Sequence, residues 1–471
     1  MQRVGLVLGI ALFAAVLVLP PPAALPLAAW RTAAVAVLMA MWWMTEALPI
    51  AATALVPLVL FPILGIAPIA KAAPPYANSV VFLFLGGFML AAGLERSGLH
   101  RRIALGVVRA VGTRPANLVG GFLIATAALS MWVSNTATVL MMLPIATSVL
   151  ALPGDESRAK SDQLAPALLI GIAYAASIGG LGTIIGTPPN ALLAAFASET
   201  LGRRIGFVEW MAVGVPLVVV AIPICWLVLT RVAFRVGNEA NVATDELLRK
   251  QRAALGSMSR AEWTVATICT LTALAWILQP LLERVVPSIS DAAIGISGGL
   301  LLFLVPVDWK AYRFAVTWDD VERLPWGVLI LFGGGLSLAT AVESSGLAGA
   351  IGGAFAGLRG ISPLLLTAVI TTVLVFLGEI ASNTATAATF LPLVASLAGG
   401  FGIDPLLLVV PTALAASCSF MLPAGTPPNA LVYAGGRLTI PQMVRAGIWM
   451  DLVMIVLIML ATFLVVGRVF G

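Results

Sequence analysis

The chain has 471 residues, of which 60% are hydrophobic and only 10% are charged, and its mean hydropathy is +1.06. A soluble domain carries about 25% charged residues, so this composition excludes the soluble classes and indicates a polytopic membrane protein. The net charge of +5 does not indicate nucleic-acid binding, because the basic residues lie between the apolar stretches. The three cysteines are scattered in apolar runs and match neither a disulfide framework nor a metal site.

Apolar stretches long enough to cross a bilayer recur along the whole chain. The first could mimic a signal peptide, but no small-residue cleavage site with a polar mature start follows it, so we interpret it as a span. We therefore predict an all-α polytopic protein of the cell membrane with about 11 transmembrane helices. These spans lie near residues 4–20, 30–47, 50–68, 79–98, 165–200, 208–232, 262–281, 289–306, 326–345, 405–434 and 443–468.

Two further apolar stretches, 115–150 and 361–398, are too interrupted for one span and too short for two. Each carries a Ser-Asn-Thr motif near its middle and a proline in its later half. We interpret both as re-entrant helical hairpins with the motif at the tip. Non-helical backbone at membrane depth is tolerated only where protein or water covers it.

The distribution of basic residues supports this set of spans. With the N-terminus in the cytoplasm, the segments predicted to face the cytoplasm hold 19 of the 26 Lys and Arg residues, in agreement with the positive-inside rule. The polar linker 236–262 divides an N-terminal half, 1–235, from a C-terminal half, 263–471. The predicted cytoplasmic segments are 1–3, 96–114, 153–164, 231–262, 307–323 and 435–446.

Two phrases occur twice in the sequence. Residues 134–138 read Ser-Asn-Thr-Ala-Thr and are repeated at 382–386, while Gly-Thr-Pro-Pro-Asn-Ala-Leu at 186–192 is repeated at 425–431. One such motif is weak evidence, since Ser and Thr often bond back to a helix carbonyl. Duplicated helix breaks in corresponding positions, however, indicate the binding site of a secondary transporter near the middle of the bilayer.

The repetition extends beyond these phrases. Seven further residues match at the spacing of 248 positions that separates Ser134 from Ser382, so that the span 79–98 corresponds to 326–345. In the predicted topology these two spans cross the membrane in opposite directions. The halves are therefore predicted to be inverted repeats, an architecture that supports alternating access to a fixed site.

The motif residues have the chemistry to bind an anion and a small cation together. Helix N-termini attract anions, and unwound backbone carbonyls coordinate cations. Asn offers an amide donor and a carbonyl acceptor, while Ser and Thr offer hydroxyls. The Pro-Pro pairs are predicted to break the spans 165–200 and 405–434, which brings a second set of backbone groups to the same depth.

Together with Trp-Trp-Met-Thr-Glu-Ala at 42–47, the paired motifs resemble the divalent anion:sodium symporter family over about the whole chain. The resemblance implies a homodimer of inverted repeats in which a transport domain moves like an elevator against a scaffold. It implies transport of di- or tricarboxylates such as succinate, malate, fumarate or citrate, or of sulfate in some branches. Most members use sodium as the coupling ion, some are exchangers, and no other cofactor is implied.

The resemblance assigns the ion and substrate sites to motif residues. One sodium site would use Ser130, Ser134, Asn135 and the Gly186 backbone, and the pseudo-symmetric one would use Ala381, Asn383 and Gly425. Substrate carboxylates would contact Asn135, Thr136, Thr187, Ser382, Asn383, Thr384, Thr426 and Pro427.

One position departs from the family pattern. Gly378 stands where family members often have Thr, whereas Ser130, its repeat partner, keeps a hydroxyl. The second sodium site would then use backbone oxygens, water or Glu379. A sodium-independent dicarboxylate exchanger, and a transporter of sulfate or another divalent anion, therefore remain alternatives.

The other polar residues favour neither an enzyme nor a channel. An intramembrane enzyme would need a nucleophile–base pair or a set of metal ligands. The chain has one histidine, His100, no aspartate pair within the spans and no clustered cysteines. Broken helices in inverted repeats favour a carrier over a channel. Glu46 and Glu379 are explained by helix packing as well as by ion binding, and Glu95 and Glu343 by their position near span ends.

The predicted topology can be tested by labelling from each side of the membrane. The linker 236–262 is expected on the cytoplasmic face, and Arg359 and Gly471 on the opposite face, because the basic residues are distributed so unequally. In a variant without native cysteines, a cysteine at Ser257 and one at Gly471 should react with an impermeant thiol reagent from opposite faces. Labelling of both from one face would contradict the inverted repeats.

Overall fold

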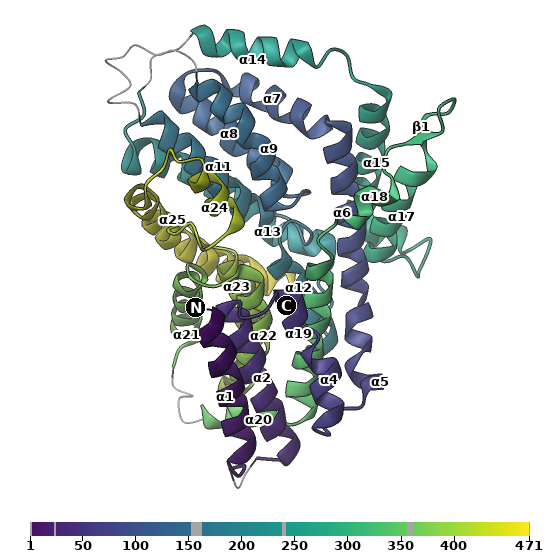
Figure 1. The fold of residues 1–471 in the computed structure, drawn as a ribbon, viewed down its shortest axis with the longest axis vertical. Coiled ribbons are helices and arrows are strands. Elements are labelled where there is room, and N and C mark those ends of the chain that lie inside the picture. Colours follow the sequence, from purple (N-terminus) through teal and green to yellow (C-terminus); the bar gives the residue numbers. More distant parts are fainter. Residues whose placement is uncertain (1, 23–24, 152–162, 238–241, 356–360, 471) are drawn as a thin grey trace.

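The computed structural model is mostly helical over the residues it describes (Figure 1). Within that part of the chain, six helices or helix runs are long and apolar enough to cross a membrane, and shorter apolar helices accompany them. Of the predicted topology, Met1, residues 153–162, residues 238–241 of the linker, Arg359 and Gly471 lie outside the described residues. The described ranges are 2–22, 25–151, 163–237, 242–355 and 361–470.

The described residues of the first half form a series of helices. In chain order they are α1 (Gln2–Val18), α2 (Leu27–Thr45), α3 (Ile50–Thr53), α4 (Val56–Ile63), α5 (Ile69–Ala72), the 3-10 turn η1 (Pro74–Ala77), α6 (Ser79–Ser97), α7 (Leu99–Val111), α8 (Pro115–Ser130), α9 (Asn135–Leu150), α11 (Leu164–Gly180), α12 (Pro188–Thr200), α13 (Phe207–Leu227) and the π-helical turn η2 (Val228–Ala233).

The second half repeats much of this order and adds a small antiparallel hairpin. Its elements are α14 (Val242–Ala254), α15 (Arg260–Ile277), α16 (Gln279–Leu282), α17 (Asp291–Leu304), β1 (Pro306–Asp308) paired with β2 (Arg313–Phe314), α18 (Trp318–Glu322), α19 (Trp326–Ser344), α20 (Leu347–Ala354), α21 (Pro363–Gly378), α22 (Asn383–Phe401), α23 (Leu406–Ala416), α24 (Pro427–Ala434), α25 (Ile440–Ala461), the π-helical turn η4 (Thr462–Val466) and α26 (Gly467–Val469).

The repeated motifs lie at four breaks, each between two consecutive helices. The Ser-Asn-Thr motifs separate α8 from α9 and α21 from α22, and the Gly-Thr-Pro-Pro-Asn motifs end the breaks between α11 and α12 and between α23 and α24. The breaks that the Pro-Pro pairs predicted in the spans 165–200 and 405–434 are therefore present. Proline has no N–H and a φ angle suited to a first helical turn, which is why α12 and α24 both begin on it.

Three features differ from the sequence expectation. The stretch 50–68 is not one helix but the short helices α3 and α4, because Pro57, in the first turn of α4, has no N–H with which to continue α3. The later arm of the second hairpin runs on to Phe401, past the predicted end at 398. The helices α7, α14 and α20 and the hairpin of β1 with β2 had no sequence prediction, because each is too short or too polar to read as a span.

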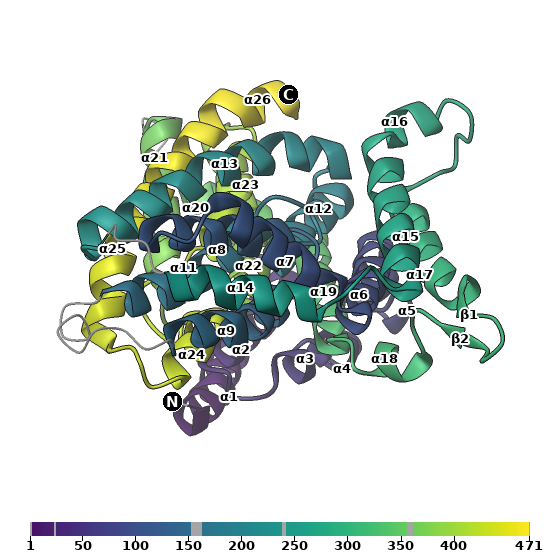
Figure 2. The same cartoon turned by 90° about the horizontal axis from the view of Figure 1, so that it is seen from above.

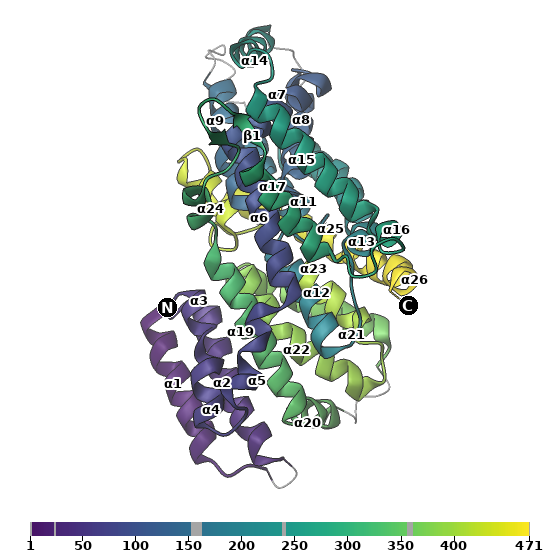
Figure 3. The ribbon, with the colours of Figure 1, turned by 90° about the vertical axis from the view of Figure 1, so that its right-hand side faces the viewer.

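The helices form an elongated body (Figures 1 and 3). In Figures 1 and 3, α1, α2, α4 and α20 lie at one end, α7, α8, α9 and α14 at the other, and α12 and α23 between them. Figure 2 shows α15, α16, α17 and the β hairpin together on one side. The corresponding helices α6 and α19 run in opposite directions, since α6 leads up to α7 while α19 leads down to α20 (Figure 3).

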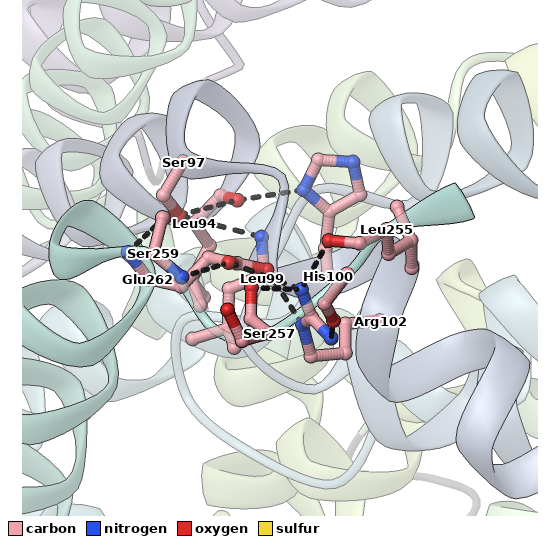
Figure 4. Close-up of polar contacts among 10 residues, drawn as sticks. Leu94, Ser97, Leu99, His100, Arg102, Leu255, Ser257, Ser259 and Glu262 are labelled. Atoms are coloured by element: carbon pink, nitrogen blue, oxygen red, sulfur yellow. Dashed lines mark hydrogen bonds and ion pairs between the residues drawn. The ribbon is translucent and has the colours of Figure 1, made fainter. Parts of the chain in front are cut away.

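A polar cluster fastens the linker to α7 (Figure 4). The Arg102 guanidinium donates to the Glu262 carboxylate, with Nε 2.7 Å from Oε1, and to the backbone carbonyls of residues 255–257. His100 lies alongside, and its Nδ1 is 2.6 Å from the Leu94 carbonyl oxygen. These contacts hold residues 255–262, at the end of the linker, against α7 in the first half of the chain.

Candidate functional site

A cavity of about 1120 Å³ lies where the repeated motifs meet. Both Ser-Asn-Thr motifs and both Gly-Thr-Pro-Pro motifs contribute to its wall, together with residues from α6 and from the region around α18 and α19. Segments from opposite halves of the chain therefore surround one space. All eight residues that the resemblance assigned to substrate lie on this wall: Asn135, Thr136, Thr187, Ser382, Asn383, Thr384, Thr426 and Pro427.

Two long helices begin at the cavity. Asn135 is the first residue of α9 and Asn383 the first of α22, and both line the space. Ser134 caps α9, because its hydroxyl oxygen accepts from the Ala137 N–H at 3.3 Å. First-turn N–H groups have no partner within their helix and carry partial positive charge, so both ends attract an anion without a buried basic side chain.

Two further helices point their N-termini at the same space. Pro188 opens α12 and Pro427 opens α24, so neither helix has an N–H at its first position. The preceding residues, Thr187 and Thr426, line the cavity with their hydroxyls at the ends of these helices. These two helix ends therefore contribute a favourable dipole and hydroxyl groups rather than backbone donors.

In the first half, neutral oxygens surround a small space beside Gly180. The Ser130 hydroxyl is 2.7 Å from Asn135 Oδ1 and 2.8 Å from the Ala176 carbonyl oxygen. A Cβ atom on Gly180 would lie 2.7 Å from Asn135 Oδ1 and 3.1 Å from the Gly186 carbonyl oxygen, so only glycine leaves this space open. Hydroxyl, amide and backbone oxygens held this way fit a hard cation such as sodium.

The second half presents a related but different cradle. Asn383 and Gly425 line the cavity, and Ala381 lies behind its wall, 4% exposed. A Cβ atom on Gly425 would lie 2.9 Å from the Ser419 Cβ atom of the same break, so a side chain here would force a shift. Gly378 leaves this cradle without the hydroxyl that Ser130 supplies in the first.

Comparison with known proteins decides the family. A family model described as the sodium:sulfate symporter transmembrane region matches residues 1–469. The chain belongs to the divalent anion:sodium symporter family. The sodium-dependent dicarboxylate transporter SdcS of Staphylococcus aureus (strain NCTC 8325 / PS 47) is 41% identical over 479 residues, which cover 100% of this chain and 92% of that protein. The SdcS protein of Staphylococcus saprophyticus is 40% identical with the same coverage.

A solved structure shares the fold. The crystal structure of the Alcanivorax borkumensis YdaH transporter aligns with a TM-score of 0.59 at 17% sequence identity, covering 83% of this chain and 85% of that one. Family membership makes the protein a secondary transporter of the cell membrane and not an enzyme.

A buried asparagine supports the break between α11 and α12, and another supports the break between α23 and α24. Asn190 Nδ2 donates from α12 back to the Gly180 carbonyl (3.0 Å) and to a second carbonyl three residues further on (2.8 Å). Asn429 Nδ2 makes the same pair of bonds, to the Ser419 carbonyl (3.0 Å) and to one three residues on (3.1 Å). The repeated Gly-Thr-Pro-Pro-Asn phrase contained this signal, but its asparagine was not among the predicted site residues.

Glu379 organises the break between α23 and α24. Its carboxylate accepts the backbone N–H groups of Phe420 (2.5 Å), Met421 (3.0 Å) and Leu422 (2.8 Å), and the residue is 2% exposed. A carboxyl group has two oxygens that can each accept hydrogen bonds, so one side chain satisfies three backbone groups that the break releases. The structure therefore uses both Glu379 oxygens for support of the break.

Of the other three glutamates named in the sequence analysis, two line the cavity and one does not. Glu46 ends α2 in the left-handed conformation, with φ +47°, and lines the cavity, as does Glu95. Arg96, beside Glu95, forms an ion pair with Asp320 at the rim. Glu343 lies exposed near the end of α19.

Replacement of Glu379 by Gln should destabilise the protein. The glutamine keeps one acceptor but turns an NH2 group toward backbone N–H donors, and an unsatisfied buried donor costs about 1–3 kcal/mol. We expect Glu379→Gln to lower the thermal unfolding temperature in detergent and to reduce uptake. Glu343→Gln, at an exposed carboxylate, is the control. An unfolding temperature equal to that of the wild type would show that the break does not depend on this carboxylate.

Proposed function

We propose that the protein imports or exports di- or tricarboxylates of the succinate, malate, fumarate and citrate class by sodium-coupled secondary transport. The observation that carries this proposal is the meeting of four helix N-termini from two repeats at one cavity, with neutral oxygen cradles beside them. The name of SdcS, at 41% identity over the whole chain, supports both the substrate class and sodium.

The two halves offer matching groups to the two ends of a dicarboxylate. Asn135 and Thr136 on one side, and Asn383 and Thr384 on the other, bring amide and hydroxyl donors to the cavity. Four further residues of the cavity wall complete the proposed substrate contacts: Thr187, Ser382, Thr426 and Pro427. Binding through neutral donors leaves the anion's charge to be balanced by sodium, which couples the two ligands electrostatically.

Sodium is assigned to the two cradles. In the first it would contact Ser130, Ser134, Asn135 and the Gly186 carbonyl, and in the second Ala381, Asn383 and Gly425. Asn135 and Asn383 belong to both the ion and the substrate sets. A sodium ion bound at either cradle would therefore fix the amide that meets the anion, so that each ligand favours binding of the other.

Alternating access is proposed to follow from inverted repeats in a homodimer, with an elevator movement of the motif helices against the rest. The opposite directions of the matching helices α6 and α19 support the inverted arrangement. The breaks of both halves meet around one cavity, which supports movement of the site as a unit.

Two narrower alternatives have observations in their favour. A sodium-independent dicarboxylate exchanger is favoured by Gly378, which lacks the hydroxyl of its repeat partner. A sulfate transporter is favoured by the description of the family model. Both predict the same cavity and differ from the proposal only in the coupling ion or the anion.

Uptake into proteoliposomes separates these functions. With radiolabelled succinate, citrate or sulfate outside, an inward sodium gradient should accelerate carboxylate uptake, and replacement of sodium by choline should abolish it. Sulfate at equal concentration should compete weakly. Uptake that is indifferent to sodium but accelerated by succinate inside the vesicles would replace the symporter by the exchanger, and preferred uptake of sulfate would replace the substrate class.

Both asparagines of the Ser-Asn-Thr motifs should be required for substrate. Loss of a hydrogen bond to a charged group costs about 1.5–3 kcal/mol, so Asn135→Ala and Asn383→Ala should each weaken dicarboxylate affinity by about tenfold or more. Affinity is measured as the succinate concentration for half-maximal uptake at saturating sodium. Asn117→Ala is the matched control, because its side chain contacts the Val111 carbonyl at the far end of α8. Wild-type affinity in either motif variant would refute the assignment.

A further inference from the structure

The two cradles contain the same pair of residue types in exchanged positions. In the first half, a serine ends α8 (Ser130) and a glycine ends α11 (Gly180). In the second half, the residue that ends α21 is Gly378, and the residue that corresponds to Gly180 in the repeat is Ser419. Asn190 and Asn429 confirm this alignment, since they donate to the carbonyls of Gly180 and Ser419 respectively.

The two serine hydroxyls contact equivalent atoms. Ser130 Oγ is 2.7 Å from Asn135 Oδ1, and Ser419 Oγ is 3.2 Å from Asn383 Oδ1. A Cβ atom on Gly378 would lie 2.8 Å from Ser419 Oγ, so the Ser419 hydroxyl fills the space that a side chain at 378 would enter. A hydroxyl is therefore present beside the motif asparagine in both halves, from the end of α8 in the first and from the break after α23 in the second.

We propose that Ser419 supplies the hydroxyl ligand of the second sodium site, in place of the side chain that Gly378 lacks. This assignment rests on the sodium-coupled function proposed above. It means that the second cradle has a side-chain oxygen from the break after α23, in addition to Asn383 and the backbone. The absence of a hydroxyl at 378 then does not argue for a sodium-independent exchanger.

The surroundings of Ser419 fix its position. Its side chain is buried, its carbonyl accepts from Asn429, and the N–H of the next residue, Phe420, donates to Glu379 at 2.5 Å. Both polar groups of the peptide that joins Ser419 to Phe420 are thus held by buried side chains. A ligand oxygen on such a fixed backbone requires little rearrangement when an ion binds.

The direct test measures sodium binding without transport. Purified wild-type protein in detergent, free of substrate, should unfold at a higher temperature as sodium replaces choline. We expect Ser419→Ala to raise the sodium concentration for half-maximal stabilisation by about tenfold or more, because a ligand to a charged group is lost. Ser417→Ala should leave it unchanged, since the Ser417 hydroxyl, in the same break, contacts the Ala413 carbonyl of its own helix.

An exchange of the two residues tests the position of the hydroxyl. Ser419→Gly should impair sodium binding like Ser419→Ala. The double variant Gly378→Ser with Ser419→Gly should restore the sodium midpoint to within about threefold of the wild type. In this variant the hydroxyl comes from the end of α21, which corresponds to the end of α8 in the first half. Gly378→Ser alone should be unstable, since its Cβ would meet Ser419 Oγ. If Ser419→Ala does not fold, Ser419→Cys keeps the shape but replaces a hard oxygen by soft sulfur, with the same expected loss.

The outcomes separate this inference from the proposed function. If sodium neither stabilises the wild type nor drives its uptake, sodium coupling itself is wrong. If the wild type responds and Ser419→Ala responds equally, the Ser419 assignment is wrong. If Ser419→Ala weakens succinate affinity even at saturating sodium, with the sodium midpoint unmoved, Ser419 only positions Asn383 and the assignment is also wrong.

Discussion

The structure depends on how it satisfies backbone groups at helix breaks inside an apolar protein. A break releases N–H and C=O groups that lipid cannot satisfy, so nearby protein must do so. Asn190 and Asn429 donate to carbonyls of the two breaks, and Glu379 accepts three N–H groups of one of them. These three side chains keep the chain unwound at a fixed place, and the cavity lies between the helix ends that result.

The same breaks supply the chemistry of the site. Helix ends that face a common space offer N–H groups and dipoles for an anion, while unwound carbonyls and the motif hydroxyls offer neutral oxygens for a cation. The repeated motifs themselves contain no lysine or arginine, so in the proposed function neutral donors meet the anion. The proposal assigns the balance of the anion's charge to sodium bound beside it.

The two halves solve one problem with different residues. Where the second half has Glu379, the first has Met131, whose carbonyl accepts from the Thr183 hydroxyl at 2.5 Å across the break. Where the first half takes its hydroxyl from the hairpin arm, the second takes it from the broken helix at Ser419. The two halves therefore both place a hydroxyl beside the motif asparagine, although different residues carry it.

The sequence by itself determined the class, the helical architecture, the family and the four breaks. Hydropathy reports burial in lipid directly, and the paired motifs with their prolines mark where helices must stop. It did not determine that Asn190, Asn429 and Glu379 support the breaks, nor that Ser419 meets Asn383, since these contacts join residues that a linear motif does not link. The departure at Gly378 looked like a loss when only its own motif was considered. Only the tertiary structure brought a second helix break against it, and thereby showed a hydroxyl in the space that the missing side chain leaves.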